Sequence, residues 1–122
     1  MPIILVVEEP LQDIVRDALE EAGFDHTTVA SGRDAVAMIE SGVVKYSALV
    51  TDINVKGPMK GWEIARLVRQ IDPAFPIIYM TGAAAEDWAS EGVPNSILLQ
   101  KPFAPAQLVT AVSQLLNKGA PA

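Results

Sequence analysis

Five short apolar runs, each followed by a helical pattern, constrain this chain more than any other feature of its sequence. The run Ile3–Val7 is continuously apolar and rich in β-branched residues, which is typical of a strand buried on both faces of a sheet. Alternating strands and helices favour a parallel sheet, because parallel strands need crossover connections. The sequence therefore predicts an α/β fold with five strands and helices on both faces. The other four strands are expected at 26–30, 48–50, 77–80 and 97–99.

The segments between these runs carry helical patterns with recognisable ends. Ser31 is positioned to cap a helix that Gly42 ends. Pro105 suits the first turn of the last helix, because its missing N–H is not needed there. The stretch 82–92 has Trp88 as its only large apolar residue, and it predicts a poor helix.

Composition limits the functions open to the chain. Its 122 residues suffice for one domain, and we expect that domain at 1–118, a flexible tail at 119–122 and no effector domain. The net charge of −6 argues against nucleic acid binding, which needs a basic surface. The absence of cysteine excludes disulfides, thiolate metal sites and a cysteine nucleophile. The first apolar run is too short for a signal peptide or a membrane span, so we expect a cytoplasmic protein that binds no membrane.

Polar side chains follow four of the five expected strands. Glu8 and Glu9 follow the first strand, Asp52 the third, Thr81 the fourth and Lys101 the fifth. The carboxyl ends of parallel strands meet at one edge of the sheet, which is where ligands bind in such folds. Three carboxylates placed together repel one another unless a cation joins them, and Mg²⁺ prefers such oxygen ligands.

Each of these residues alone has an ordinary interpretation as a helix cap or a solvated loop residue. Their combination favours phosphoryl transfer, in which positioning and charge neutralisation supply most of the catalysis. Lys101 offers a movable point charge for phosphoryl oxygens, and Thr81 offers a hydroxyl donor to the same group.

Four segments resemble receiver domains of bacterial response regulators, the phosphoproteins of two-component signal transduction. They are IILVVEEP, ALVTDINV, IIYMTG and LLQKPF, and GPMKGWEIAR resembles the loop and third helix of many receivers. The resemblance covers essentially the whole chain. It implies a flavodoxin-like (βα)5 three-layer sandwich whose parallel strands have the order 2-1-3-4-5.

The resemblance also implies roles for the candidate residues. Asp52 would be the phosphoacceptor, and Lys101 and Thr81 would contact the phosphoryl group. Mg²⁺ would be held by Asp52, the backbone carbonyl of Asn54 and Glu9, and Glu8 would orient a metal-bound water. The Lys101–Pro102 bond is cis in similar proteins. These metal and phosphoryl sites together involve Glu8, Glu9, Asp52, Asn54, Thr81 and Lys101.

Function and partners follow from the same resemblance. The protein would take its phosphoryl group from a histidine kinase or a histidine phosphotransfer protein, as in a phosphorelay, and would then switch its binding to a downstream protein target. It would catalyse its own phosphorylation and dephosphorylation without being a turnover enzyme. The last two strand–helix units form the face that similar domains use for homodimers.

Two features depart from the common receiver pattern. The acidic pair is Glu-Glu, where Asp is usual at the metal position, and many relatives have VVEDEPL in place of VVEEPL. Two alignments stay open: Glu8 and Glu9 form the pair, or one residue is missing and only Glu8 remains in the site. The position three before Lys101, usually aromatic in receivers that couple threonine motion to their output face, is Leu98, which we expect to be a core strand residue. These departures motivate an alternative, a degenerate receiver that acts as a phosphorylation-independent protein-interaction module.

Three further residues have structural interpretations. Trp62, at a helix start, is expected to pack in the core, and His26, on a weak strand, is expected to be solvated. Trp88 is expected to pack back onto the sheet, with a partner anchor as the alternative. A small hydrolase or nucleotide-binding enzyme is disfavoured, because the sequence has neither a glycine-rich phosphate loop after the first strand nor a G-x-S-x-G elbow.

Overall fold

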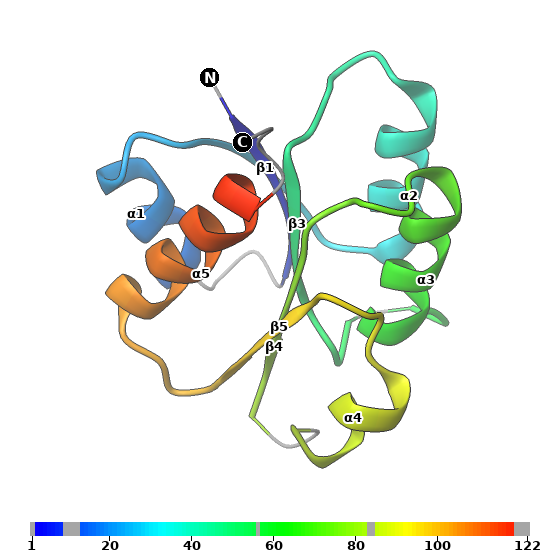
Figure 1. Cartoon of the computed structure of the whole chain (residues 1–122). Helices are drawn as coiled ribbons and strands as arrows, with labels where there is room; N and C mark the ends of the chain where they lie inside the picture. Colours follow the sequence, from blue (N-terminus) through cyan, green and yellow to red (C-terminus); the bar gives the residue numbers. More distant parts are fainter. Residues whose placement is uncertain (1, 9–12, 56, 83–84, 119–122) are drawn as a thin grey trace.

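A parallel five-stranded sheet forms the middle layer of the protein (Figure 1). The computed structural model describes residues 2–8, 13–55, 57–82 and 85–118. The sheet order is β2-β1-β3-β4-β5, so the predicted fold and strand order are confirmed. The strands are β1 (Ile3–Val7), β2 (Asp25–Val29), β3 (Ala48–Asp52), β4 (Ile77–Thr81) and β5 (Ile97–Gln100).

Helices cover both faces of this sheet. On one face lie α1 (Asp13–Glu21) and α5 (Pro105–Lys118), and on the other lie α2 (Gly32–Ser41) and α3 (Gly61–Ile71) (Figure 1). A single 3-10 turn, η1 (Ala85–Asp87), precedes the four-residue α4 (Trp88–Glu91), on the same side as α3. Within the described ranges, no helix combines the length and apolar character needed to cross a bilayer.

The alternation of side chains along each strand builds two separate cores. Leu5 and Val7 of β1 belong to the cluster under α2 and α3, whereas Ile4 and Val6 belong to the cluster under α1 and α5. All four side chains are fully buried. Successive residues of a strand point to opposite faces, so a sheet covered on both sides needs apolar residues at every position.

The predicted ends of α2 are confirmed. The Ser31 side chain accepts a hydrogen bond from the Asp34 N–H at 3.2 Å, which satisfies one of the free donors at the helix start. Gly42 has a φ of 68° and its N–H donates to the Ile39 carbonyl, so the chain leaves the helix through the left-handed conformation that glycine adopts without strain.

Two side chains in or beside α1 are exposed or buried against their polarity. Ile14 is apolar, yet it is 60% exposed, because it lies near the start of the helix. His26 was expected to be solvated, but its side chain is only 15% exposed and its Nε2 lies 3.1 Å from Glu20 Oε1 of α1.

The segment around α4 is held by polar contacts more than by apolar packing. None of the residues of η1 or α4 is buried, which agrees with the poor helix predicted for 82–92. Trp88 belongs to neither core cluster and is 38% exposed, so the expected packing onto the sheet is wrong. Its Nε1–H donates to Ser96 Oγ at 3.0 Å, and the ring lies so close to Gly92 that a Cβ there would approach Cδ1 to 2.4 Å.

Tyr79 connects this segment to the core. Its side chain is fully buried on β4, and its hydroxyl accepts a hydrogen bond from the Val93 N–H at 3.1 Å. Burial raises the pKa of the Tyr79 phenol above its ordinary value. Trp62 packs against it at a ring-centroid distance of 4.7 Å with 60° between the planes, which confirms the core role expected for Trp62.

Replacing this phenol tests the connection. Tyr79→Phe leaves the buried Val93 N–H without its acceptor, which is expected to lower the free energy of unfolding by about 1–3 kcal/mol in urea denaturation. Tyr46→Phe is the matched control, because Tyr46 is also buried but its hydroxyl makes no hydrogen bond within the described ranges. Equal losses in the two variants would show that the Tyr79–Val93 bond does not stabilise the fold.

Candidate functional site

Strand pairing brings four of the predicted site residues to one edge of the sheet. Val7 pairs with Thr51 and Asp52 pairs with Met80, so Glu8, the next residue after β1, lies level with the end of β3. Thr81 pairs with Gln100, and the Lys101 N–H donates to the Thr81 carbonyl at 2.7 Å. The register therefore places Glu8, Asp52, Thr81 and Lys101 where the strands end.

Buried polar residues distinguish this edge from the rest of the described structure. Among the described residues, the buried polar or charged ones are Glu8, Thr51, Asp52 and Thr81, each of which exposes 6% or less of its whole-residue surface. All four lie at the carboxyl ends of adjacent strands. Burial of polar groups costs free energy unless they find partners, so such a cluster indicates a site and not a structural surface.

An ion pair crosses the site from one strand to another. Lys101 Nζ lies 2.6 Å from Asp52 Oδ1, with the lysine side chain 32% exposed and the aspartate side chain 8% exposed. The lysine follows β5 and the aspartate ends β3, so the side chain spans the end of β4. The contact holds a cation beside the carboxylate expected to react, and it offsets part of the cost of burying that carboxylate.

The described donors fit a hard divalent cation. Glu8 and Asp52 supply two buried carboxylates against the one ammonium of Lys101, and oxygen ligands of this kind suit Mg²⁺, which takes one or two carboxylates and keeps several waters. Glu9 lies outside the described residues, and the described part of the chain contains no group of three histidine, cysteine or acidic side chains that could hold a metal. Asn54 lies two residues beyond Asp52 in the following loop, with its side chain exposed.

Gly61 lies directly against the backbone of Asp52. Its N–H donates to the Ile53 carbonyl at 2.8 Å, and a Cβ at this position would lie 2.5 Å from the Asp52 carbonyl oxygen and 2.8 Å from Ile53 Cα. Only glycine lets the start of α3 approach the end of β3 this closely. The sequence showed Gly61 only as part of the segment GPMKGWEIAR, because the close approach of two backbones leaves no pattern beyond the glycine itself.

The position that is usually aromatic in receivers is Leu98 here, whereas the aromatic residue Tyr79 lies two residues before Thr81 on β4. Leu98 is partly buried and packs against the core cluster that contains Tyr79, which confirms it as a core strand residue. Leu98 pairs with Tyr79 in the ladder between β4 and β5. The Lys101–Pro102 peptide bond is cis, as the resemblance implied.

The chain belongs to the response regulator receiver family, whose model matches residues 3–113. It is 32% identical over 120 residues to the response regulator receiver protein CpdR of Brucella abortus, covering 95% of this chain and 98% of that protein. It is 28% identical to the transcriptional regulatory protein CusR of Escherichia coli. That match covers 96% of this chain and 52% of CusR. This chain therefore spans nearly all of the first relative and about half of the second.

Solved structures of receivers are similar in fold and sequence. A response regulator receiver protein from Sinorhizobium medicae is 48% identical with a TM-score of 0.86, covering 96% of this chain and 94% of that one. The receiver domain of the sensor histidine kinase PA1611 from Pseudomonas aeruginosa is 26% identical with a TM-score of 0.81, covering 95% and 98%. That structure contains a magnesium ion coordinated in its active site cleft.

The close approach at Gly61 has a measurable consequence. Gly61→Ala is expected to lower the free energy of unfolding by about 1–3 kcal/mol, because the added methyl group must displace backbone that also carries Asp52. Gly82→Ala is the control, since its Cβ would meet nothing nearer than Lys101 Cβ at 4.0 Å, and we expect a change within about 0.5 kcal/mol. Similar stabilities of the two variants in urea denaturation would contradict the close approach.

Proposed function

We propose that this protein accepts a phosphoryl group on Asp52 from the phosphohistidine of a kinase or phosphotransfer protein, and that phosphorylation switches its binding to a downstream protein. One observation carries the proposal. The Asp52 carboxylate lies in a cluster of buried polar side chains, with the Lys101 ammonium 2.6 Å away, at the carboxyl edge of a receiver fold.

The chemistry follows from these groups. A carboxylate oxygen of Asp52 attacks phosphorus, the bond from phosphorus to the donor nitrogen breaks, and the electron pair stays on the leaving imidazole. Lys101 moves its charge from the carboxylate to the phosphoryl oxygens, and Thr81 donates a hydrogen bond to the same group. Water later attacks the phosphorus of the acyl phosphate, which releases inorganic phosphate and restores the carboxylate.

A metal ion completes this proposal. Asp52, the Asn54 backbone carbonyl, Glu8 and Glu9 would hold Mg²⁺, which when bound offsets the negative charge of the phosphoryl oxygens. Under the alternative alignment, in which one residue is missing from the acidic pair, Glu8 and Asp52 remain as the carboxylates.

The switch is proposed to run through Tyr79. Thr81 and Tyr79 are two residues apart on β4 and so point to the same face of the sheet. The Tyr79 hydroxyl is bonded to Val93 in the connection after α4, and α4 itself contains no buried residue. A shift of Thr81 would therefore reach the weakly packed α4 segment through Tyr79. This route does not need the aromatic residue that Leu98 replaces. The last two strand–helix units, β4–α4 and β5–α5, form the proposed face of a homodimer.

Phosphorylation can be measured directly. Intact-mass analysis after incubation with acetyl phosphate and Mg²⁺ is expected to show one added phosphoryl group, absent without Mg²⁺ and absent in Asp52→Asn. Asp34→Asn, an exposed carboxylate in α2, is the control and is expected to be modified like the wild type. Because a short-lived adduct would escape detection, beryllofluoride binding with Mg²⁺ is measured on the same sample. Failure of both would leave the degenerate receiver, a binding module that works without phosphorylation.

The role of the lysine has its own test. Lys101→Ala removes the cation that faces the reacting oxygens, and the rate of phosphorylation by acetyl phosphate is expected to fall by about 10²–10³-fold. Lys45→Ala, an exposed lysine outside the site, should keep the wild-type rate. An unchanged rate in Lys101→Ala would remove Lys101 from the mechanism.

A further inference from the structure

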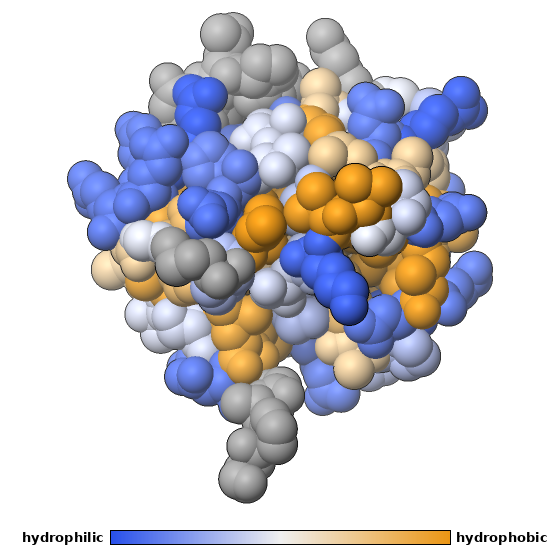
Figure 2. Space-filling view, turned by 90° about the horizontal axis from the view of Figure 1, so that it is seen from above, coloured by the Kyte–Doolittle hydropathy of each residue, from blue (hydrophilic) through white to orange (hydrophobic). Residues whose placement is uncertain are grey.

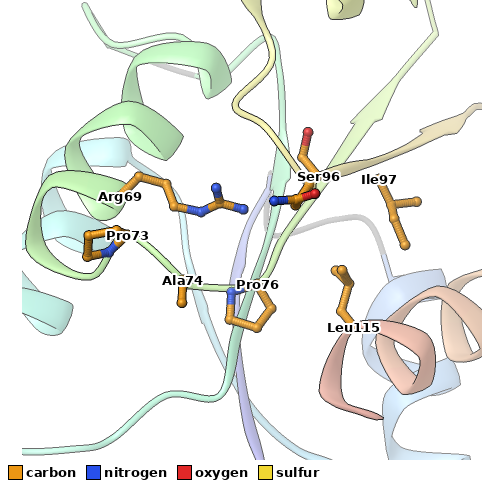
Figure 3. A pocket seen from close by; sticks show the side chains of 8 residues that line it. Arg69, Pro73, Ala74, Pro76, Ser96, Ile97 and Leu115 are labelled. Carbon is orange, nitrogen blue, oxygen red and sulfur yellow. The ribbon is translucent and has the colours of Figure 1, made fainter. Parts of the chain in front are cut away.

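A cavity of about 290 Å³ lies at the opposite edge of the sheet, where β4 and β5 begin (Figure 3). Its walls come from the connection after α3, the residues before β5 and the last turns of α5, and they include Pro73, Pro76, Ile97 and Leu115. Viewed from above, the molecule shows hydrophobic side chains among hydrophilic ones (Figure 2). The cavity is separated from Asp52 by the length of the strands, so it is no part of the phosphorylation site.

Arg69 is the charged group of this cavity. Its Nε–H donates to the Phe75 carbonyl and its Nη1 donates to the Pro94 carbonyl, both at 2.6 Å. These bonds fix the guanidinium between two connections, and Figure 3 shows it extending from α3 toward Ser96. A guanidinium has five N–H donors, and within the described residues the others make no hydrogen bond.

This guanidinium makes no direct ion pair within the described part of the chain, although the Asp72 carboxylate acts on its pKa in the opposite direction to burial, and the same helix offers a contrast. Arg66, one turn earlier on α3, pairs with Glu91 at 2.5 Å on the exposed surface. Arg69 is less exposed than Arg66, and desolvation by burial lowers the pKa of its guanidinium from its usual range. Asp72 and the two carbonyls compensate this charge only in part, since burial still lowers the pKa, so an anion in direct contact with the guanidinium would stabilise it.

The remaining walls decide what kind of anion fits. Two prolines, an isoleucine and a leucine offer apolar surface beside the single cation, and the volume is near the lower limit of ligand pockets, about 300 Å³. An inorganic anion would leave the apolar walls exposed to water. A neutral apolar molecule would leave the Arg69 guanidinium without a counterion in direct contact. A planar guanidinium matches the two oxygens of a carboxylate.

We propose that this cavity binds a small organic carboxylate, whose oxygens pair with the free donors of Arg69 and whose short apolar chain lies against Pro76, Ile97 and Leu115. Because Arg69 also holds the Pro94 carbonyl, the ligand would contact the connection that follows α4 without touching Asp52. The inference does not depend on phosphorylation, and it holds equally for a degenerate receiver.

The test uses ¹H–¹⁵N NMR titration of the full chain with sodium isovalerate at constant ionic strength. Saturable shifts are expected for the amides of Ser96 and Ile97 and for the Arg69 Nε–H, with half-saturation on the order of 1 mM. Isovaleramide has the same shape without the charge, and its affinity is expected to be lower by at least about tenfold. Equal shifts with the amide or with inorganic phosphate, or no saturable shifts with isovalerate, would overturn the proposal.

Two variants tie the binding to the cavity. Ala74→Leu fills the cavity from its rim and leaves both Arg69 hydrogen bonds in place, so it is expected to abolish the isovalerate shifts while the spectrum stays folded. This variant is preferred to a change at Arg69, which would also remove two contacts between connections. Arg66→Gln is the matched control and should bind like the wild type, since Arg66 does not line the cavity. Undiminished binding by Ala74→Leu would place the ligand elsewhere and sink the assignment.

Discussion

A parallel sheet covered by helices on both faces has no side that contacts water, so its polar side chains must gather where the strands end. In β1, β3, β4 and β5 the strand residues between the ends are apolar apart from Thr51, and they divide alternately between two cores, whereas the edge strand β2 carries polar residues at 26–28. The buried polar side chains of the described chain, Glu8, Thr51, Asp52 and Thr81, all lie at the carboxyl edge. The same constraint that stabilises the fold therefore concentrates the chemistry, and the Lys101–Asp52 contact offsets part of its cost.

Helix α3 links the two ends of the molecule. At its start, Gly61 allows the helix to press against the backbone of Asp52, and nearer its end Arg66 and Arg69 hold the segment around α4. That segment buries little apolar surface of its own, and its other anchor is the hydroxyl of Tyr79. Polar anchors of this kind can exchange partners at low free-energy cost, whereas displacing an apolar core exposes its surface to water, so this segment suits the switch proposed for it.

The two sites use the same fold in different ways. At the carboxyl edge Glu8 and Asp52 are buried at the ends of adjacent strands and Lys101 contacts Asp52, which favours a cation and a phosphoryl group. At the amino edge an arginine that makes no direct ion pair within the described residues faces apolar walls, which favours an organic anion. Both regions contact the connection between α4 and β5, because Tyr79 bonds to Val93 and Arg69 bonds to Pro94.

Local patterns determined much of this protein. The apolar runs predicted all five strands, Ser31 and Gly42 predicted the ends of α2, and polar residues after the strands predicted which side chains share an edge. Such features depend on periodicity, caps and topology, which a linear sequence displays. Only the tertiary structure decided the contacts between distant segments: Glu20 shields His26, Ser96 holds Trp88, Gly61 meets the Asp52 backbone, and Arg69 faces a cavity. These depend on how close two elements come, and packing distances are set by the whole core and leave no local pattern.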